Sequence, residues 1–383
     1  MWLGDALDAA ASASELGAVW SELTVVARGL MADDVDARDI AAVISHELCA
    51  LTARACELAE QELADAGQGS SPVDYAMLVL GSGGRGESLL AMDQDNAIVY
   101  RAGEPGGPED QWLERLGARV ADILNMAGVA YCKGGIMARN SEWRMSLDGW
   151  RAAVDGWLRR SRPGDLLNTD IFFDAVPVHG TLALGETLRE EALEAAGQAR
   201  GFLKLMAVNA ASIAVPPLGW LGRFKLEDRR MDLKRGGIMP IFSAARALAL
   251  QHGVTARSTP ERLAAVSGKG DADPALIDSL TEALITDLSQ IRALRVIGRT
   301  SVMRCARRRV VYSPHDLFSR RGFVDGVLLD LALLLRRALR VSPRVGEPLE
   351  LVFGALSIGM FSVPEPNLAS DGTDPAAVED HVS

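Results

Sequence analysis

Residues Gly81 to Tyr100, GSGGRGESLLAMDQDNAIVY, decide the fold, because they join a glycine-rich turn to two closely spaced carboxylates. The preceding run, Tyr75 to Leu80 (YAMLVL), is short and apolar and ends at Gly81. It therefore predicts a buried strand that leads into a tight turn. The β-branched and aromatic residues in Asn96 to Tyr100 predict a second strand.

The glycine-rich turn predicts a place where the backbone can approach an anion. Glycines at positions 81, 83, 84 and 86 lack the side chains that would block such an approach. Ser82 adds a hydroxyl beside the free N–H groups of the turn. We therefore expect Gly81 and Ser82 to bind phosphate, although a glycine-rich turn alone is a weak signal because most such turns are only turns.

The two carboxylates, Asp93 and Asp95, flank Gln94 just before the second predicted strand. Side chains alternate along an extended segment, so Asp93 and Asp95 are expected on one face and Gln94 on the other. Converging carboxylates repel each other unless a cation lies between them, and hard oxygen ligands suit Mg²⁺. The alternative is a solvated strand start, in which the acids cap a turn by accepting hydrogen bonds from backbone N–H groups.

The order of strand, Gly-Ser, Asp-x-Asp and strand resembles the nucleotidyltransferase superfamily of DNA polymerase β type. The pattern Gly-Ser-x-Gly-Arg-x-Glu followed by Asp-Gln-Asp-Asn is similar to a nucleotidyltransferase family that is often fused to CBS domains and is related to PII uridylyltransferase. The likeness covers roughly residues 10 to 340, and no CBS sequence is visible. Three further stretches carry it: CKGGIMARNSEWR (132–144), DIFFD (170–174) and MDLKRGGIMP (231–240).

The resemblance implies an α+β fold with a small mixed sheet. Helical spacing predicts an N-terminal helical segment at 1–72, before a nucleotidyltransferase domain at 73–180 that includes a helix at 112–127. A helical substrate-binding domain is expected at 181–345, and a tail rich in Pro, Asp and Gly at 362–383 is expected to be disordered. Within the helical domain, helices are expected at 186–214, 238–252, 260–266, 274–296 and 323–340.

The polymerase-like mechanism implies a third carboxylate on an adjacent strand, and Asp174 is our candidate. It is a lone acid in the apolar run from Ile171 to Val176, where a carboxylate needs a partner, water or a metal ion. If the strand begins later, Asp170 caps the turn and Asp174 alone reaches the site. A hydrogen-bonded structural acid is the alternative, and Glu142 and Asp148 are weaker candidates.

Two cations are expected near the nucleotide. Arg85 could bind the triphosphate through its guanidinium, or it could form an ion pair with Glu87 or Asp93 that fixes the loop. Lys234 precedes a glycine pair and an apolar helix, so it could contact phosphate or could face solvent beside an ordinary capped helix.

Composition limits the partners. The 383 residues are 48% apolar and 24% charged, which allows a sizeable core, and the net charge of −11 argues against nucleic acid as a partner.

The N-terminus lacks the basic and then apolar layout of a secretory signal, and the longest apolar run, Val327 to Leu335, is too short to span a bilayer. We therefore expect a cytoplasmic protein without membrane insertion. The four cysteines have no CxxC spacing, which argues against a zinc site or a disulfide framework.

Together these features predict transfer of a nucleoside monophosphate from a nucleoside triphosphate (NTP) to an acceptor hydroxyl. Asp93, Asp95 and Asp174 would hold Mg²⁺, for which Mn²⁺ could substitute, and Gly81, Ser82, Arg85 and Lys234 would bind the nucleotide. The kinship with PII uridylyltransferase suggests a regulatory protein as acceptor, and a small molecule is permitted equally well. The alternative is a nucleotide-binding regulatory or protein-docking module with little or no catalysis.

Overall fold

The computed structural model describes residues 3–90, 92–212, 239–269 and 277. All of them belong to the first of two contact units, Met1–Ser342, and the second unit is Pro343–Ser383. The expected helix at 323–340 and the expected tail at 362–383 therefore lie outside the described residues. So does the expected helix at 274–296, apart from Ile277.

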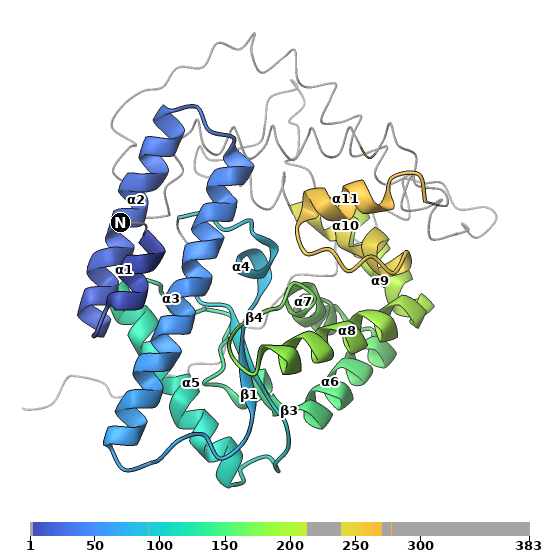
Figure 1. The fold of residues 1–383 in the computed structure, drawn as a ribbon. Coiled ribbons are helices and arrows are strands. Elements are labelled where there is room, and N and C mark those ends of the chain that lie inside the picture. Colours follow the sequence, from blue (N-terminus) through green and yellow to red (C-terminus); the bar gives the residue numbers. More distant parts are fainter. Residues whose placement is uncertain (1–2, 91, 213–238, 270–276, 278–383) are drawn as a thin grey trace, which may run out of the picture. The chain divides into compact units, whose positions relative to one another are not determined.

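A mixed four-stranded sheet forms the centre of the described fold (Figure 1). In the order β3-β2-β1-β4, β1 pairs antiparallel with both β2 and β4, while β2 and β3 are parallel. The predicted strands at 75–80 and 96–100 are confirmed as β1 and β2. The strands are β1 (Tyr75–Val79), β2 (Asn96–Tyr100), β3 (Arg144–Ser146) and β4 (Val176–Gly180).

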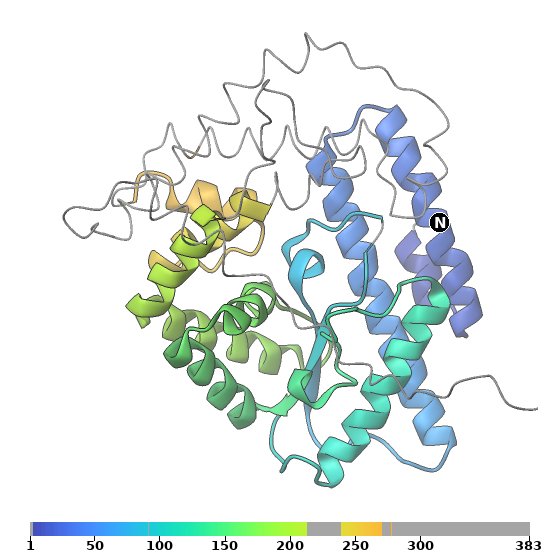
Figure 2. The same ribbon diagram turned by 180° about the vertical axis from the view of Figure 1, so that it is seen from behind.

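Helices cover both faces of this sheet (Figures 1 and 2). All residues of β1 and β2 are buried, and the alternation of side chains divides them between two cores. Met77 and Ile98 belong to the core shared with α1, α3 and α5, whereas Leu78 and Val99 belong to the core shared with the helices that follow β3. The sheet is therefore the middle layer of a helix–sheet–helix arrangement.

The N-terminal helical segment predicted before residue 73 is confirmed. Ser12 and Asp36 cap the second and third helices by accepting hydrogen bonds from the Glu15 and Arg38 backbone N–H groups. The predicted helix at 112–127 begins four residues earlier, at Pro108, because proline is well suited to the first helical turn. The helices on this face are α1 (Leu3–Ala9), α2 (Ala13–Ala32), α3 (Ala37–Asp65) and α5 (Pro108–Ala127).

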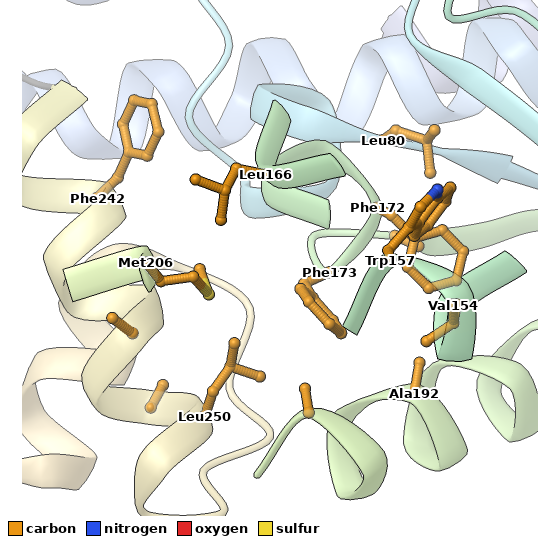
Figure 3. Close-up of a cluster of buried hydrophobic side chains, with 14 of the residues drawn as sticks. Leu80, Val154, Trp157, Leu166, Phe172, Phe173, Ala192, Met206, Phe242 and Leu250 are labelled. Atoms are coloured by element: carbon orange, nitrogen blue, oxygen red, sulfur yellow. The ribbon is translucent and has the colours of Figure 1, made fainter. Parts of the chain in front are cut away.

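The opposite face carries an aromatic core (Figure 3). Trp150 and Phe172 stack with ring centroids 5.0 Å apart. Trp157 meets Phe172 edge-on at 5.7 Å, and both side chains are labelled in Figure 3. Trp143 is buried beside them. The helical elements after β2 on this side are η1 (Ser141–Trp143), α6 (Leu147–Arg160), α7 (Pro163–Phe172), α8 (Leu182–Gln198), α9 (Arg200–Ser212), α10 (Met239–Gln251) and α11 (Thr259–Val266).

Two expected boundaries differ in the structure. The apolar run Ile171 to Val176 is not one strand, because α7 continues to Phe172 and β4 starts only at Val176. A short apolar run fits a buried helix end as well as a strand, and Pro163 at the first helical turn starts the helix. The expected helix at 186–214 is two helices, α8 and α9, which are separated at Ala199.

Candidate functional site

The glycine-rich turn forms the five-residue helix α4 (Gly81–Arg85), which follows β1 directly (Figure 1). Its glycines serve two purposes. Gly81 has a φ of +56°, and a Cβ there would lie 3.2 Å from Oδ2 of Asp95. A Cβ on Gly84 would lie 1.8 Å from the backbone oxygen of Asp174. Gly84 therefore permits close backbone packing, while Gly81 leaves room beside a carboxylate.

Asp93 and Asp95 lie just before β2, in a segment whose backbone and Gln94 side chain are held by hydrogen bonds. The Leu80 N–H donates to the Asp95 carbonyl at 2.9 Å, which joins this segment to the start of α4. Gln94 is buried, and its amide nitrogen donates to the carbonyls of Ala121 and Val129, both at 2.9 Å. Asp93 is exposed and Asp95 is half-buried, which agrees with the expected alternation about Gln94.

These two acids could hold a divalent cation. Carboxylate oxygens are hard ligands, and the absence of a side chain at Gly81 keeps space next to Asp95. The buried Cys132 thiol lies near Asp95, and burial together with this neighbouring charge raises the pKa of Cys132 to about 11. A neutral thiol thus lies beside Asp95 and adds no charge to this part of the site.

Asp174 has a different environment from the one expected. Its carboxylate is fully buried and forms ion pairs with three arginines: with Arg85 at 2.5 Å, with Arg262 at 2.8 Å, and with Arg246. Burial alone would raise the pKa of Asp174, but the attraction of the three guanidinium groups outweighs it and lowers that pKa. Asp174 is therefore ionised, and both of its carboxylate oxygens contact guanidinium groups.

The expected three-carboxylate metal set is not assembled. Within the described ranges, no group of three or more His, Cys, Asp or Glu side chains is arranged to hold a metal ion. Asp93, Asp95 and Asp174 are all described, so this finding corrects the expectation that Asp174 completes a metal site. The physical reason is that both Asp174 oxygens are committed to guanidinium groups.

Arg85 occupies the end of α4 and is only 7% exposed. Its Nε donates to Glu87 at 2.9 Å, and its guanidinium lies 4.2 Å from the centroid of the Phe242 ring. The predicted ion pair with Glu87 is confirmed. Glu87 in turn accepts a hydrogen bond from the Thr259 N–H at 2.6 Å, so it fixes the first residue of α11.

Arg246 and Arg262 are functional candidates that the sequence interpretation missed. Arg246 is the one charged residue in the apolar run 241–250, and Asp174 is the one charged residue in 171–176. Opposite lone charges in two apolar segments are a signal for a buried ion pair. Lys234, the remaining predicted site residue, lies outside the described residues.

The fold and these residues define a nucleotidyltransferase-like protein. Residues 21–164 match the family model described as "Putative nucleotidyltransferase DUF294", and residues 200–308 match "Putative nucleotidyltransferase substrate binding domain". The chain belongs to this family. Among curated proteins, none matches the chain. Asp93 and Asp95 fall in the first matched segment, Arg246 and Arg262 fall in the second, and Asp174 lies between the two. No described helix combines the length and apolar character needed to cross a membrane.

Proposed function

We propose that this chain is a Mg²⁺-dependent nucleotidyltransferase that moves a nucleoside monophosphate from an NTP to an acceptor hydroxyl. One observation carries the proposal: the Asp95 carboxylate faces the glycine-rich turn across Gly81, just before β2 and two residues after Asp93. Phosphate held at the turn would then lie beside two carboxylates, as phosphoryl transfer requires.

Asp93 and Asp95 would hold Mg²⁺, or Mn²⁺ in its place. When bound, the cation would neutralise negative charge on the phosphate oxygens. Gly81 and Ser82 would bind the outer phosphates through backbone N–H groups and the Ser82 hydroxyl, which is half-buried at the turn. In the reaction, the acceptor oxygen forms a bond to the α-phosphorus, the bond to pyrophosphate breaks, and the acceptor proton passes to a base or to water.

Two observations guide the proposal for the acceptor: the resemblance to PII uridylyltransferase, and the match of residues 200–308 to a substrate-binding domain. Residues 200–308 match a substrate-binding domain, so the acceptor would bind there. A hydroxyl on a regulatory protein, as in PII uridylyltransferase, and a hydroxyl on a small molecule are both consistent with the chemistry. The net charge of −11 favours either of these over a nucleic acid.

A second function, a nucleotide-binding or protein-docking module without catalysis, is favoured by one specific observation. Asp174 is committed to three arginines, and among the described residues no third carboxylate joins Asp93 and Asp95 in a group that could hold a metal ion. Two carboxylates are enough to bind a metal–nucleotide complex, whereas transfer depends on activating the acceptor as well.

Calorimetric titration with ATP, UTP, GTP and CTP, with and without Mg²⁺, tests the proposal. The unaltered chain is compared with the Asp93→Asn, Asp95→Asn double variant and with a control, Asp5→Asn, Asp8→Asn, which removes two exposed acids from α1. Metal-dependent binding should be lost in the first variant only, with the thermal unfolding midpoint of all three proteins unchanged. Undiminished binding in the first variant would refute the metal assignment.

Pyrophosphate release then separates the two functions. With an acceptor present, an enzyme releases pyrophosphate at a rate that the Asp93→Asn, Asp95→Asn variant abolishes. A binding module binds NTP and releases no pyrophosphate above the uncatalysed rate.

A further inference from the structure

A five-residue loop lies opposite Asp95. The Gln94 N–H donates to the Ala130 carbonyl at 2.9 Å, and the Asn96 N–H donates to the Ile136 carbonyl at 3.1 Å. Between these bonds, one residue, Asp95, faces residues 131–135 of the neighbouring segment. The extra residues must leave the line of pairing, as in a large bulge.

The loop is closed by a tight turn with Lys133 at its tip. The Gly135 N–H donates to the Cys132 carbonyl at 3.1 Å, so Lys133 and Gly134 are the two central residues of a four-residue turn. The Asn140 side-chain nitrogen donates to the Gly135 carbonyl at 2.6 Å and holds the far end of the turn. Lys133 itself is exposed, while its neighbour Cys132 is buried.

Three arginines in the described part of this region, Arg139, Arg144 and Arg85, are held by other groups. Arg139 lies 3.6 Å from Asp122 and 5.3 Å from the centroid of the Tyr131 ring, and Arg144 pairs with Asp110 at 2.7 Å. Arg85 is held between Glu87 and Asp174. Lys133, by contrast, forms no ion pair within the residues that the structure describes. Among the described residues, Lys133 is therefore a cation on the loop opposite Asp95 that is open to an anionic ligand.

We propose that Lys133 contacts the triphosphate of the nucleotide bound at the Asp93–Asp95 site. The assignment rests on the proposed function and adds a residue to it. A triphosphate carries more charge than one divalent ion neutralises, and a flexible lysine on an exposed turn supplies a compact charge with three donors. Arg85 and Lys234 were the sequence-based candidates for this charge. Arg85 is held by two ion pairs, and Lys234 lies outside the described residues.

The test compares Lys133→Gln, Lys133→Arg and the control Lys204→Gln, which alters an exposed lysine on α9. Affinity for Mg²⁺-bound NTP and for the corresponding nucleoside monophosphate is measured by calorimetry at two salt concentrations. Lys133→Gln should weaken NTP binding about tenfold or more, the usual range for one charge-assisted contact, with monophosphate affinity nearly unchanged. Lys133→Arg should restore most of the loss, and Lys204→Gln should match the unaltered chain.

The NTP affinity of Lys133→Gln should also depend less on salt, because one ionic contact has been removed. Unchanged NTP affinity in Lys133→Gln, or equal loss for NTP and monophosphate, would overturn the assignment while the proposed function stands. Failure of the unaltered chain to bind any NTP would overturn both.

Discussion

Arg85 and Asp174, which are 89 residues apart in sequence, form a buried ion pair whose Nη1 and Oδ2 atoms are 2.5 Å apart. The pair joins the last residue of α4 to the connection between α7 and β4. Arg246 on α10 and Arg262 on α11 reach the same carboxylate. One acid thus ties the glycine-rich turn to helices of the segment that matches a substrate-binding domain.

Charge balance explains why so many arginines can be buried here. Three guanidinium groups face three carboxylates: Asp174, Glu87, which binds Arg85, and Asp170, which binds Arg246 at 2.8 Å. Burial raises the pKa of Asp170, although Arg246 opposes the shift. Removing any one charge from such a network leaves an uncompensated ion in the interior.

Asp174→Asn should therefore destabilise the fold strongly. The loss is expected to be about 3–5 kcal/mol in the free energy of unfolding, the usual cost of breaking a buried ion pair on one side. Chemical denaturation followed by circular dichroism measures it. The control Asp148→Asn breaks an exposed ion pair with Arg151 and should cost under about 1 kcal/mol. Similar losses in the two variants would contradict the ascribed role of Asp174.

Gly84→Ala should destabilise the contact between α4 and the connection that carries Asp174, because the new side chain would overlap with backbone atoms there. The new Cβ would lie 1.8 Å from the Asp174 carbonyl oxygen, so backbone must move and the expected cost is about 3 kcal/mol or more. Gly201→Ala is the matched control, because a Cβ at that position on α9 meets no atom within 4 Å. It should be neutral or stabilising by up to about 1 kcal/mol. Denaturant midpoints measure the stability of the two variants. Equal midpoints would show that the backbone around Gly84 can move at little cost in free energy.

The sequence alone was enough to predict those strands whose signal lies in a few neighbouring residues. The run Tyr75 to Leu80 and the segment Asn96 to Tyr100 became β1 and β2, because β-branched and apolar residues next to glycine signal buried strands without long-range information. The boundary at Val176 was missed, since the apolar residues before it suit a helix end and a strand equally well.

The site was harder to predict, because its charges meet only in three dimensions. Asp93 and Asp95 are two residues apart, so the prediction that they share a face needs only the local geometry of an extended segment. The partners of Asp174 lie 89, 72 and 88 positions away at Arg85, Arg246 and Arg262, where periodicity gives no information about contact. A lone acid in an apolar run therefore suggested a metal ligand, and the structure shows an arginine cluster.

Arg85→Ala should lower stability and affect all nucleotides alike. Because the guanidinium is held by Glu87, Asp174 and the Phe242 ring, its removal is expected to cost about 3 kcal/mol of unfolding free energy. Affinities for NTP and for monophosphate should fall by the same factor, to within about twofold. Calorimetry on the folded variant measures both, and Arg101→Ala, which removes an exposed arginine paired with Asp74, is the control. A selective loss of NTP affinity would instead assign Arg85 a direct triphosphate contact.

A second charged cluster lies at the start of β1 and predicts how stability depends on pH. Glu60 on α3 accepts a hydrogen bond from the Tyr75 hydroxyl at 2.7 Å and lies 3.0 Å from Nε2 of His179 on β4. Burial alone would raise the pKa of Glu60, but these two partners outweigh it and lower the pKa below its usual value of 4.5. The folded state therefore favours the ionised carboxylate. Its contribution to stability is present above pH 4.5 and is lost as the pH falls through the folded-state pKa.

Glu60→Gln should remove that contribution. The unaltered chain should be more stable than Glu60→Gln near pH 7, and the difference should shrink progressively below about pH 4.5, where Glu60 protonates in the unfolded state first. Urea unfolding at a series of pH values from 7 to 3 measures the difference, with Glu104→Gln, which changes an exposed glutamate, as the control. A difference that stays constant over this range would mean that Glu60 stabilises the fold through packing and neutral hydrogen bonds, because only a shifted ionisation makes the difference depend on pH.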